Sequence, residues 1–144
     1  MARVSIYLNF TNQTEEAFTF YKSVFGGSFT SINRFSEVPP QKDAPPMKEE
    51  DKNLIMHIEL PIMGSYVLMG TDAPESMRPK LIQGNNMSIM LEPDTREEVD
   101  RLFHALSAGG KVEMPLTDMF WGAYYGSFTD KFGIGWMINC YNKK

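Results

Sequence analysis

A degenerate internal repeat is the feature of this sequence that most constrains its fold. Ser5–Leu8 reads SIYL, and Ser88–Leu91, 83 positions later, reads SIML. The same offset relates Phe20 to Phe103 and Gly26-Gly27 to Gly109-Gly110, and an offset of 82 relates Glu15-Glu16 to Glu97-Glu98. Because a shared spacing of several residue types rarely arises by chance, we predict two modules with the same order of elements.

Each module is predicted to contain a strand, a helix and three further strands. Thr14 and Asp94-Thr95 each precede a glutamate pair, which places a capping oxygen and first-turn carboxylates where a helix leaves its amides unpaired. The glycine pairs supply the left-handed residue that ends each helix. The predicted strands are 4–10, 28–35, 54–60 and 65–70 in the first module and 87–91, 111–114, 123–128 and 135–141 in the second.

The expected architecture is therefore α+β, with two βαβββ modules that share a single domain over residues 1–144. The first module is 1–71, the second is 87–144, and 72–86 links them. Residues 37–53 interrupt the strands of the first module with four prolines and many charges. This stretch is expected to run over the surface, and the sequence leaves open whether it is a lid or disordered.

Composition excludes several classes of partner. Fourteen basic against eighteen acidic residues give a net charge of −4 with no basic tract, which argues against a nucleic-acid partner. The longest unbroken apolar run, Tyr66–Met69, is far too short to span a membrane. Cys140 is the single cysteine, so no intramolecular disulfide is possible and a reducing compartment is favoured. The sequence thus predicts a cytoplasmic protein.

Several segments resemble the PhnB-like branch of the vicinal oxygen chelate superfamily, which includes glyoxalases, bleomycin-resistance proteins and extradiol dioxygenases. Members of this branch are often named for a 3-demethylubiquinone-9 3-methyltransferase domain. The segments that carry the resemblance are Phe20–Gly27, Met56–Leu60, Phe120-Trp121-Gly122, Tyr125-Gly126, Phe128–Asp130 and Phe132-Gly133. The resemblance implies that the two modules form a curved sheet around a pocket, commonly in a homodimer.

The resemblance also implies where a metal would bind. In the metalloenzymes of the superfamily, ligands come from the first and last strands of each module. None of these strands contains His, Asp or Glu here, and only Glu92 lies at a strand end. A divalent site needs imidazole or carboxylate ligands. We therefore expect neither a metal nor a cofactor.

A small organic ligand is the expected partner. Asn9, Met69, Ser88 and Met137 lie at or beside the positions where the metalloenzyme relatives carry ligands, so they are predicted to line the pocket. The aromatic residues Trp121 and Tyr125 are expected to close its mouth, with Pro39–Pro46 as a possible lid.

His57 and Glu59 suggest an alternative function. At i and i+2 on a predicted strand they share a face, so the carboxylate could orient the imidazole as the general base of a lyase or isomerase. The competing interpretation is a half-exposed sheet face without catalysis. A dimeric scaffold without ligand is a third hypothesis. A methyltransferase is not favoured, because no strand is followed by a glycine turn and a helix.

Overall fold

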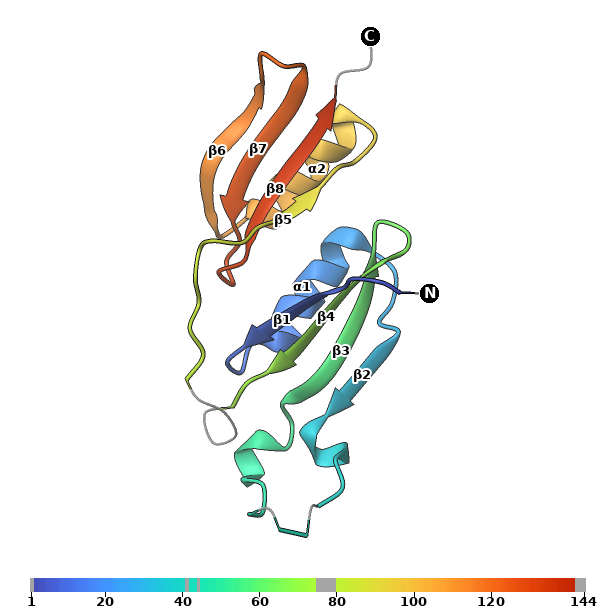
Figure 1. The fold of residues 1–144 in the computed structure, drawn as a ribbon, viewed down its shortest axis with the longest axis vertical. Helices are drawn as coiled ribbons and strands as arrows, with labels where there is room; N and C mark the ends of the chain where they lie inside the picture. The colour runs from blue at the N-terminus through green and yellow to red at the C-terminus, as the bar shows by residue number, and fades with distance from the viewer. Residues whose placement is uncertain (1, 41, 44, 75–79, 142–144) are drawn as a thin grey trace. The chain divides into compact units, whose positions relative to one another are not determined.

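The order of elements along the chain repeats the same pattern twice, strand, helix and three strands (Figure 1). The computed structural model describes residues 2–40, 42–43, 45–74 and 80–141, and the chain divides into two compact units at Ile82/Gln83. The first unit contains β1 (Ile6–Phe10), α1 (Thr14–Phe25), β2 (Ser31–Arg34), β3 (Ile55–Ile62) and β4 (Tyr66–Asp72). The second contains β5 (Ile89–Leu91), α2 (Arg96–Ser107), β6 (Lys111–Asp118), β7 (Ala123–Thr129) and β8 (Gly135–Tyr141). The predicted βαβββ repeat is confirmed.

Each unit forms its own four-stranded sheet. Sheet A has the order β1-β4-β3-β2, and sheet B has the order β5-β8-β7-β6. In both, the first strand pairs in parallel with the last strand of its unit, as Ile6 does with Leu68 and Ile89 with Trp136. The other pairs are antiparallel. The α+β class is thus confirmed, with two open sheets.

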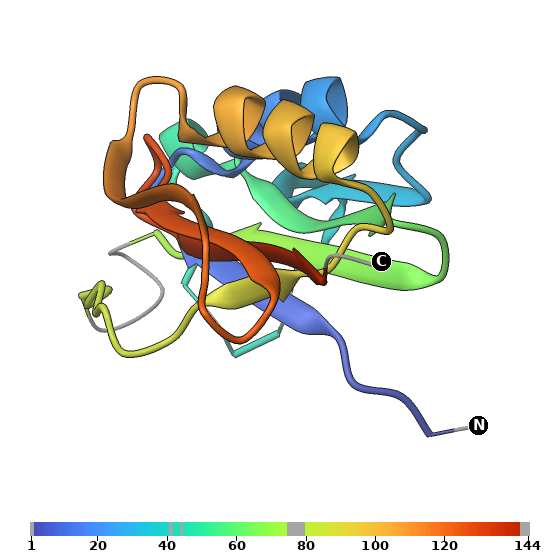
Figure 2. The ribbon, with the colours of Figure 1, turned by 90° about the horizontal axis from the view of Figure 1, so that it is seen from above.

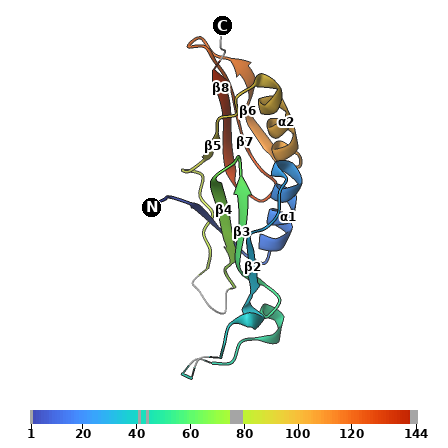
Figure 3. The same cartoon turned by 90° about the vertical axis from the view of Figure 1, so that its right-hand side faces the viewer.

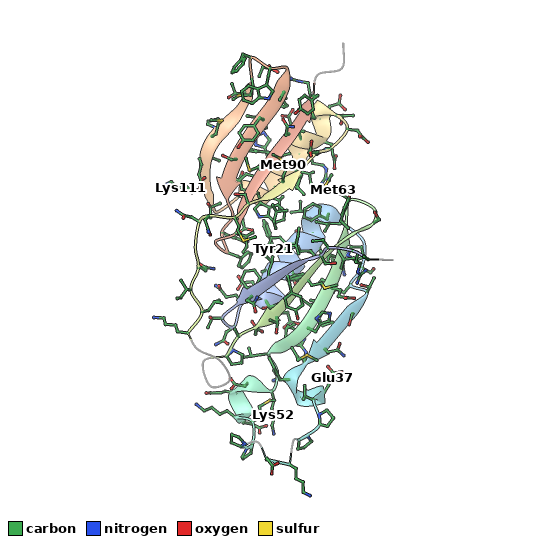
Figure 4. The ribbon with its side chains drawn as sticks, viewed as in Figure 1. Tyr21, Glu37, Lys52, Met63, Met90 and Lys111 are labelled. Atoms are coloured by element: carbon green, nitrogen blue, oxygen red, sulfur yellow. The ribbon has the colours of Figure 1, made fainter. Side chains whose placement is uncertain are left out.

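In each unit, one helix covers one face of the sheet (Figure 3). The core of the unit lies between that helix and that sheet. Tyr21, labelled in Figure 4, and Phe18 are fully buried on α1. A Cβ atom on Gly70 would lie 2.5 Å from the Phe18 ring, so glycine lets the helix approach β4 closely. Figure 2 shows α2 lying over the strands of the second unit. There the ring of Phe103 on α2 packs edge-on against that of Phe128, with centroids 5.0 Å apart.

The two helices begin differently, and one predicted cap is wrong. Thr95 caps α2 as expected, because its Oγ1 accepts a hydrogen bond from the Glu98 amide at 3.2 Å. Thr14 is instead the first helical residue of α1, buried and without a capping bond from its side chain. Its backbone amide donates to Oδ1 of Asp72, at the end of β4. A carboxylate from a distant strand therefore replaces the local cap.

The 37–53 excursion is held at both ends. Two short 3₁₀ turns lie at its ends, Phe35–Glu37 at the start and Glu49–Asp51 near the finish, where Glu37 and Lys52 are labelled in Figure 4. The Ser36 amide donates to the Lys52 carbonyl at 2.9 Å, which ties the two ends together. The predicted lid, Pro39–Pro46, includes positions 41 and 44, which lie outside the described residues.

Candidate functional site

The face of sheet A opposite α1, called here the open face of sheet A, gathers four of the predicted site residues. Successive strand residues alternate between faces, so Asn9 and Met69 point away from the helix-packed Phe10, Leu68 and Gly70. Met69 pairs with Glu59, and His57 lies two residues before Glu59 on the same strand. The i, i+2 spacing of His57 and Glu59 thus brings both side chains to this face, and their catalytic role stays a prediction.

His57 lies at the centre of a row of polar side chains on this face. Its Nδ1 lies 2.9 Å from the hydroxyl of Tyr7, and its Nε2 lies 3.3 Å from Oε1 of Glu59. The second Glu59 oxygen accepts from the hydroxyl of Thr30 at 3.4 Å. The side chains of His57 and Glu59 are 25% and 24% exposed, whereas Tyr7 is 45% exposed. Tyr7 is therefore the most exposed member of this Tyr7–His57–Glu59 chain.

Tyr7 was missed by the sequence analysis. It lies two residues before Asn9 on β1, so alternation alone places it on the same face as Asn9. Its contact with His57 crosses β4, since Tyr7 pairs with Met69 and Met69 pairs with Glu59. That contact depends on the strand order β1-β4-β3, which residue spacing does not reveal.

The remaining predicted site residues lie in the second unit. Met137 and Tyr125 lie on the face of sheet B opposite α2, because their neighbours Ile138 and Gly126 pack toward the helix. Ser88 is exposed just before β5, and Met90, labelled in Figure 4, shares the face of its partner Met137. This face, the open face of sheet B, also carries Ser127 and Asn139, which pair with Met137 and Tyr125.

Trp121 lies in the turn between β6 and β7 rather than in a strand. It is 51% exposed, and its ring packs at a right angle to that of Phe120 with centroids 4.8 Å apart. The Gly122 amide donates to the Met119 carbonyl and the Met119 amide to the Ala123 carbonyl, which fixes the turn. The sequence thus presents an aromatic pair to solvent from a well-ordered turn.

The helix-facing side of sheet B carries a second set of ionisable groups. The Tyr124 hydroxyl donates to Asp100, and this hydrogen bond, with burial, raises the pKa of Tyr124. The guanidinium of Arg96 lies 3.8 Å from the centroid of the Tyr124 ring and pairs with Asp118. Burial raises the pKa of the Cys140 thiol above its usual value, which opposes thiolate formation. These contacts fasten α2 to the sheet.

No group of three or more His, Cys, Asp or Glu side chains in the described parts of the chain is arranged to hold a metal ion. His57 and Glu59 supply one imidazole and one carboxylate, and their open-face neighbours Asn9, Met69 and Tyr7 add weak ligands. Within the described residues, no helix is both long and apolar enough to cross a membrane.

Comparison with known proteins assigns the family. The sequence model of the family described as 3-demethylubiquinone-9 3-methyltransferase matches residues 2–139. The chain belongs to this family. Protein YjdN of Escherichia coli is 30% identical to this member over 141 residues, which cover 94% of this chain and 93% of that protein.

Solved structures agree with the family assignment. The crystal structure of protein PA1353 from Pseudomonas aeruginosa is 37% identical with a TM-score of 0.81, covering 99% of this chain and all of that one. A putative 3-demethylubiquinone-9 3-methyltransferase, PhnB protein, from Bacillus cereus is 26% identical with a TM-score of 0.75, covering 96% and 99%. A glyoxalase/bleomycin resistance protein/dioxygenase family enzyme from Burkholderia phytofirmans, at 18% identity over 94% and 97% and a TM-score of 0.60, shares the fold.

The family name describes a methyl transfer, a reaction that uses a nucleotide-containing cofactor. Neither of the two strand-to-helix turns in the described residues has the glycine-rich sequence that usually binds such a cofactor. A helix that follows a strand through a glycine-rich turn holds the nucleotide part of such cofactors. The turn from β1 to α1 is Thr11-Asn12-Gln13, and the turn from β5 to α2 runs from Glu92 to Thr95 without a glycine. The PhnB-like relationship thus establishes the fold and no specific reaction.

Proposed function

We propose that this PhnB-like protein binds a small organic molecule without a metal. The observation that carries this proposal is the Tyr7–His57–Glu59 chain, a partly exposed polar group set in the otherwise uncharged open face of sheet A. Small-molecule sites combine an apolar lining with a few well-placed polar groups. Met69 supplies apolar surface beside this chain, and Asn9 adds an amide on the same face.

The same proposal gives roles to the second unit. Met137 offers an apolar surface on the open face of sheet B, and Tyr125 adds a phenol there. Trp121 would stack on a planar ligand, and Ser88 would donate a hydrogen bond beside β5. The support for these roles is the placement of each residue within its own unit.

Native mass spectrometry tests the proposal directly. The purified protein is incubated with a small-molecule extract of bacterial cells and with divalent metal salts in separate samples. A bound organic mass that is lost from the Trp121→Ala or Met69→Glu variant supports binding at these faces. A wild-type spectrum free of any organic adduct contradicts it and favours the scaffold, while a stoichiometric metal adduct contradicts the metal-free part.

A second candidate function is proton transfer by His57, in a lyase or isomerase. The 3.3 Å approach of Nε2 to Glu59 favours it, since a carboxylate orients a general base in this way. However, Nδ1 is occupied by Tyr7, so both ring nitrogens already have protein partners. This arrangement supports binding more strongly than base catalysis.

We further propose that the protein is a cytoplasmic homodimer. Each sheet has two edge strands, β1 and β2 in sheet A and β5 and β6 in sheet B, and such edges are usually paired or covered. The single buried thiol of Cys140 fits a reducing compartment. Light scattering tests the dimer, which should have twice the mass of one 16.4 kDa chain at micromolar concentration, and the mass of a single chain would contradict it.

A further inference from the structure

We infer that Arg96 is a positioning residue for the proposed binding site. From the first turn of α2 it fixes the register of β6 against β7, next to the turn that presents Trp121. This inference rests on the proposed binding function, in which Trp121 stacks on the ligand. It adds the group that holds Trp121 in place.

The pairing of β6 with β7 is irregular where it approaches this turn. β6 is an edge strand, and its register with β7 shifts twice between Val112 and Thr117. After the second shift two pairs remain before the turn, Thr117 with Tyr125 and Asp118 with Tyr124. A slip by one residue would turn the end of β6 over and change the length of the turn. The ladder by itself therefore specifies this end of the sheet weakly.

Arg96 contacts both strands at the last of these pairs. Its guanidinium donates from Nη1 to Oδ1 of Asp118 at 2.5 Å and from Nη2 to Oδ2 at 3.3 Å. The same group lies 3.8 Å from the ring centroid of Tyr124, the residue opposite Asp118. A register shifted by one residue would place Thr117 or Met119 opposite Tyr124, and neither carries a carboxylate. The observed register is thus the one that gives Arg96 both contacts.

The turn that carries Trp121 follows this pair directly. The Met119 amide donates to the Ala123 carbonyl at 2.7 Å, and the Gly122 amide donates to the Met119 carbonyl at 3.0 Å. Trp121 is 51% exposed, so the orientation of its ring depends on the turn backbone more than on packing around the ring. A contact that fixes the base of the turn therefore also fixes where Trp121 points.

Amide hydrogen exchange measured by NMR tests this role without any ligand. Arg96→Met keeps the aliphatic stem and removes the guanidinium. The Met119 and Gly122 amides should then exchange roughly tenfold faster, the combined effect of losing an exposed ion pair and a cation–π contact. Val99→Ala is the control for a general loss of stability, because Val99 is a fully buried residue of α2. It should speed exchange of the Ile138 amide in β8 and leave the two turn amides unchanged.

Binding of N-phenyl-1-naphthylamine, a neutral aromatic probe that fluoresces strongly in apolar surroundings, tests the link to Trp121. Arg96→Met and Trp121→Ala should each raise the dissociation constant roughly tenfold. The double variant should bind no more weakly than Trp121→Ala, because Arg96 acts through Trp121. Arg96→Lys, which keeps the charge but cannot form the two-nitrogen bond, should bind with intermediate affinity. Arg101→Met is the surface control, because Arg101 is similarly exposed on α2 and pairs with Glu98 of the same helix. It should bind like the wild type, as should Val99→Ala.

Three results would overturn the inference while small-molecule binding stands. The first is unchanged exchange at the Met119 and Gly122 amides in Arg96→Met, or equally faster exchange there in Val99→Ala. The second is a double variant that binds the probe roughly tenfold more weakly than Trp121→Ala. The third is a Trp121→Ala variant that binds the probe like the wild type. A wild type that does not bind the probe would instead contradict the proposed binding at this turn.

Discussion

The carboxylate of Asp72, at the end of β4, accepts a hydrogen bond from the backbone amide of Thr14, the first residue of α1, at 3.1 Å. Its other oxygen accepts from the amide of Ile55 at 2.8 Å. One buried side chain thus satisfies the start of the helix and the start of β3. Asp72 and the first-turn glutamates Glu15 and Glu16 all lie at the N-terminal end of α1, where the helix dipole favours negative charge.

Asp72→Ala should lower the free energy of unfolding by about 2–4 kcal/mol, because it leaves two buried amides without their acceptor. Urea titration followed by circular dichroism measures this change. Asp43→Ala removes an exposed aspartate and serves as the control, with an expected change within about 0.5 kcal/mol. Equal effects of the two substitutions would contradict the bridging role of Asp72.

Asp130 should be equally important in the second unit. It is buried and accepts from the Phe132 and Ile134 amides at 2.8 and 3.0 Å, and from Nε1 of Trp136 at 2.8 Å. We expect Asp130→Ala to destabilise the protein by about 2–4 kcal/mol and Asp130→Asn by less, because the amide keeps one acceptor oxygen. Tryptophan fluorescence in a Trp121→Phe background reports on Trp136 alone during urea unfolding. An Ala variant as stable as its parent would refute this prediction.

The ion pair between Glu15 and Arg34 should give stability that depends on pH. The guanidinium of Arg34 holds the pKa of Glu15 below its usual 4.5, so the contribution is present above pH 4.5 and is lost as the pH falls through the lowered value. A double-mutant cycle with Glu15→Gln and Arg34→Met should give a coupling of about 0.5–1 kcal/mol at pH 7, since the pair is exposed. Glu16→Gln, in the same helical turn, is the matched control. A coupling that stays constant down to pH 2 would contradict the assignment.

Chelation should not change thermal stability. No binding energy of a metal is expected to contribute to folding, so EDTA should leave the melting temperature of the purified protein unchanged. Differential scanning calorimetry before and after dialysis against EDTA makes this measurement. A fall of several degrees that zinc, nickel or manganese restores would show that a metal site exists.

Trp121→Ala should weaken binding of a planar fluorescent probe to the second unit by about 1–3 kcal/mol, as the loss of a stacked aromatic anchor does. Phe120→Ala removes the neighbouring ring, 98% exposed, and is the matched comparison in the same turn. Light scattering should give the same mass for both variants and the wild type. If Trp121→Ala changes the mass and leaves probe affinity intact, Trp121 belongs to a subunit interface instead.

The repeat made the fold predictable, because its spacing marks corresponding elements in both units. The first strands begin at Ile6 and Ile89, which keeps the offset of 83, and both are followed by twelve-residue helices. The ends of elements were less predictable. The strand expected at 111–114 continues to Asp118, through Pro115 and two irregularities in its pairing with β7. Proline normally interrupts a strand, but an edge strand such as β6 tolerates it. Which strand lies at the edge depends on the tertiary structure.

The candidate site was only partly predictable. Alternation correctly placed His57 and Glu59 on one face, because their relationship is local. The partnership of His57 with Tyr7 joins residues 50 positions apart across an intervening strand. In the same way, the Asp72 cap of α1 joins a helix to a strand 58 positions later. Contacts of this kind depend on strand order, which a single sequence does not specify.

The parallel pairing of β1 with β4 has a consequence for how the protein is made on the ribosome. β1 leaves the exit tunnel first, yet its one neighbour in sheet A is the last strand of the unit to be synthesised. The antiparallel β2–β3 and β3–β4 ladders join strands that are consecutive in the chain, so they can form earlier than the β1–β4 ladder. Until Tyr66–Asp72 has emerged, the nascent β1 remains a strand without a sheet, accessible to chaperones or to wrong partners. The second unit repeats this delay, because β5 waits in the same way for β8.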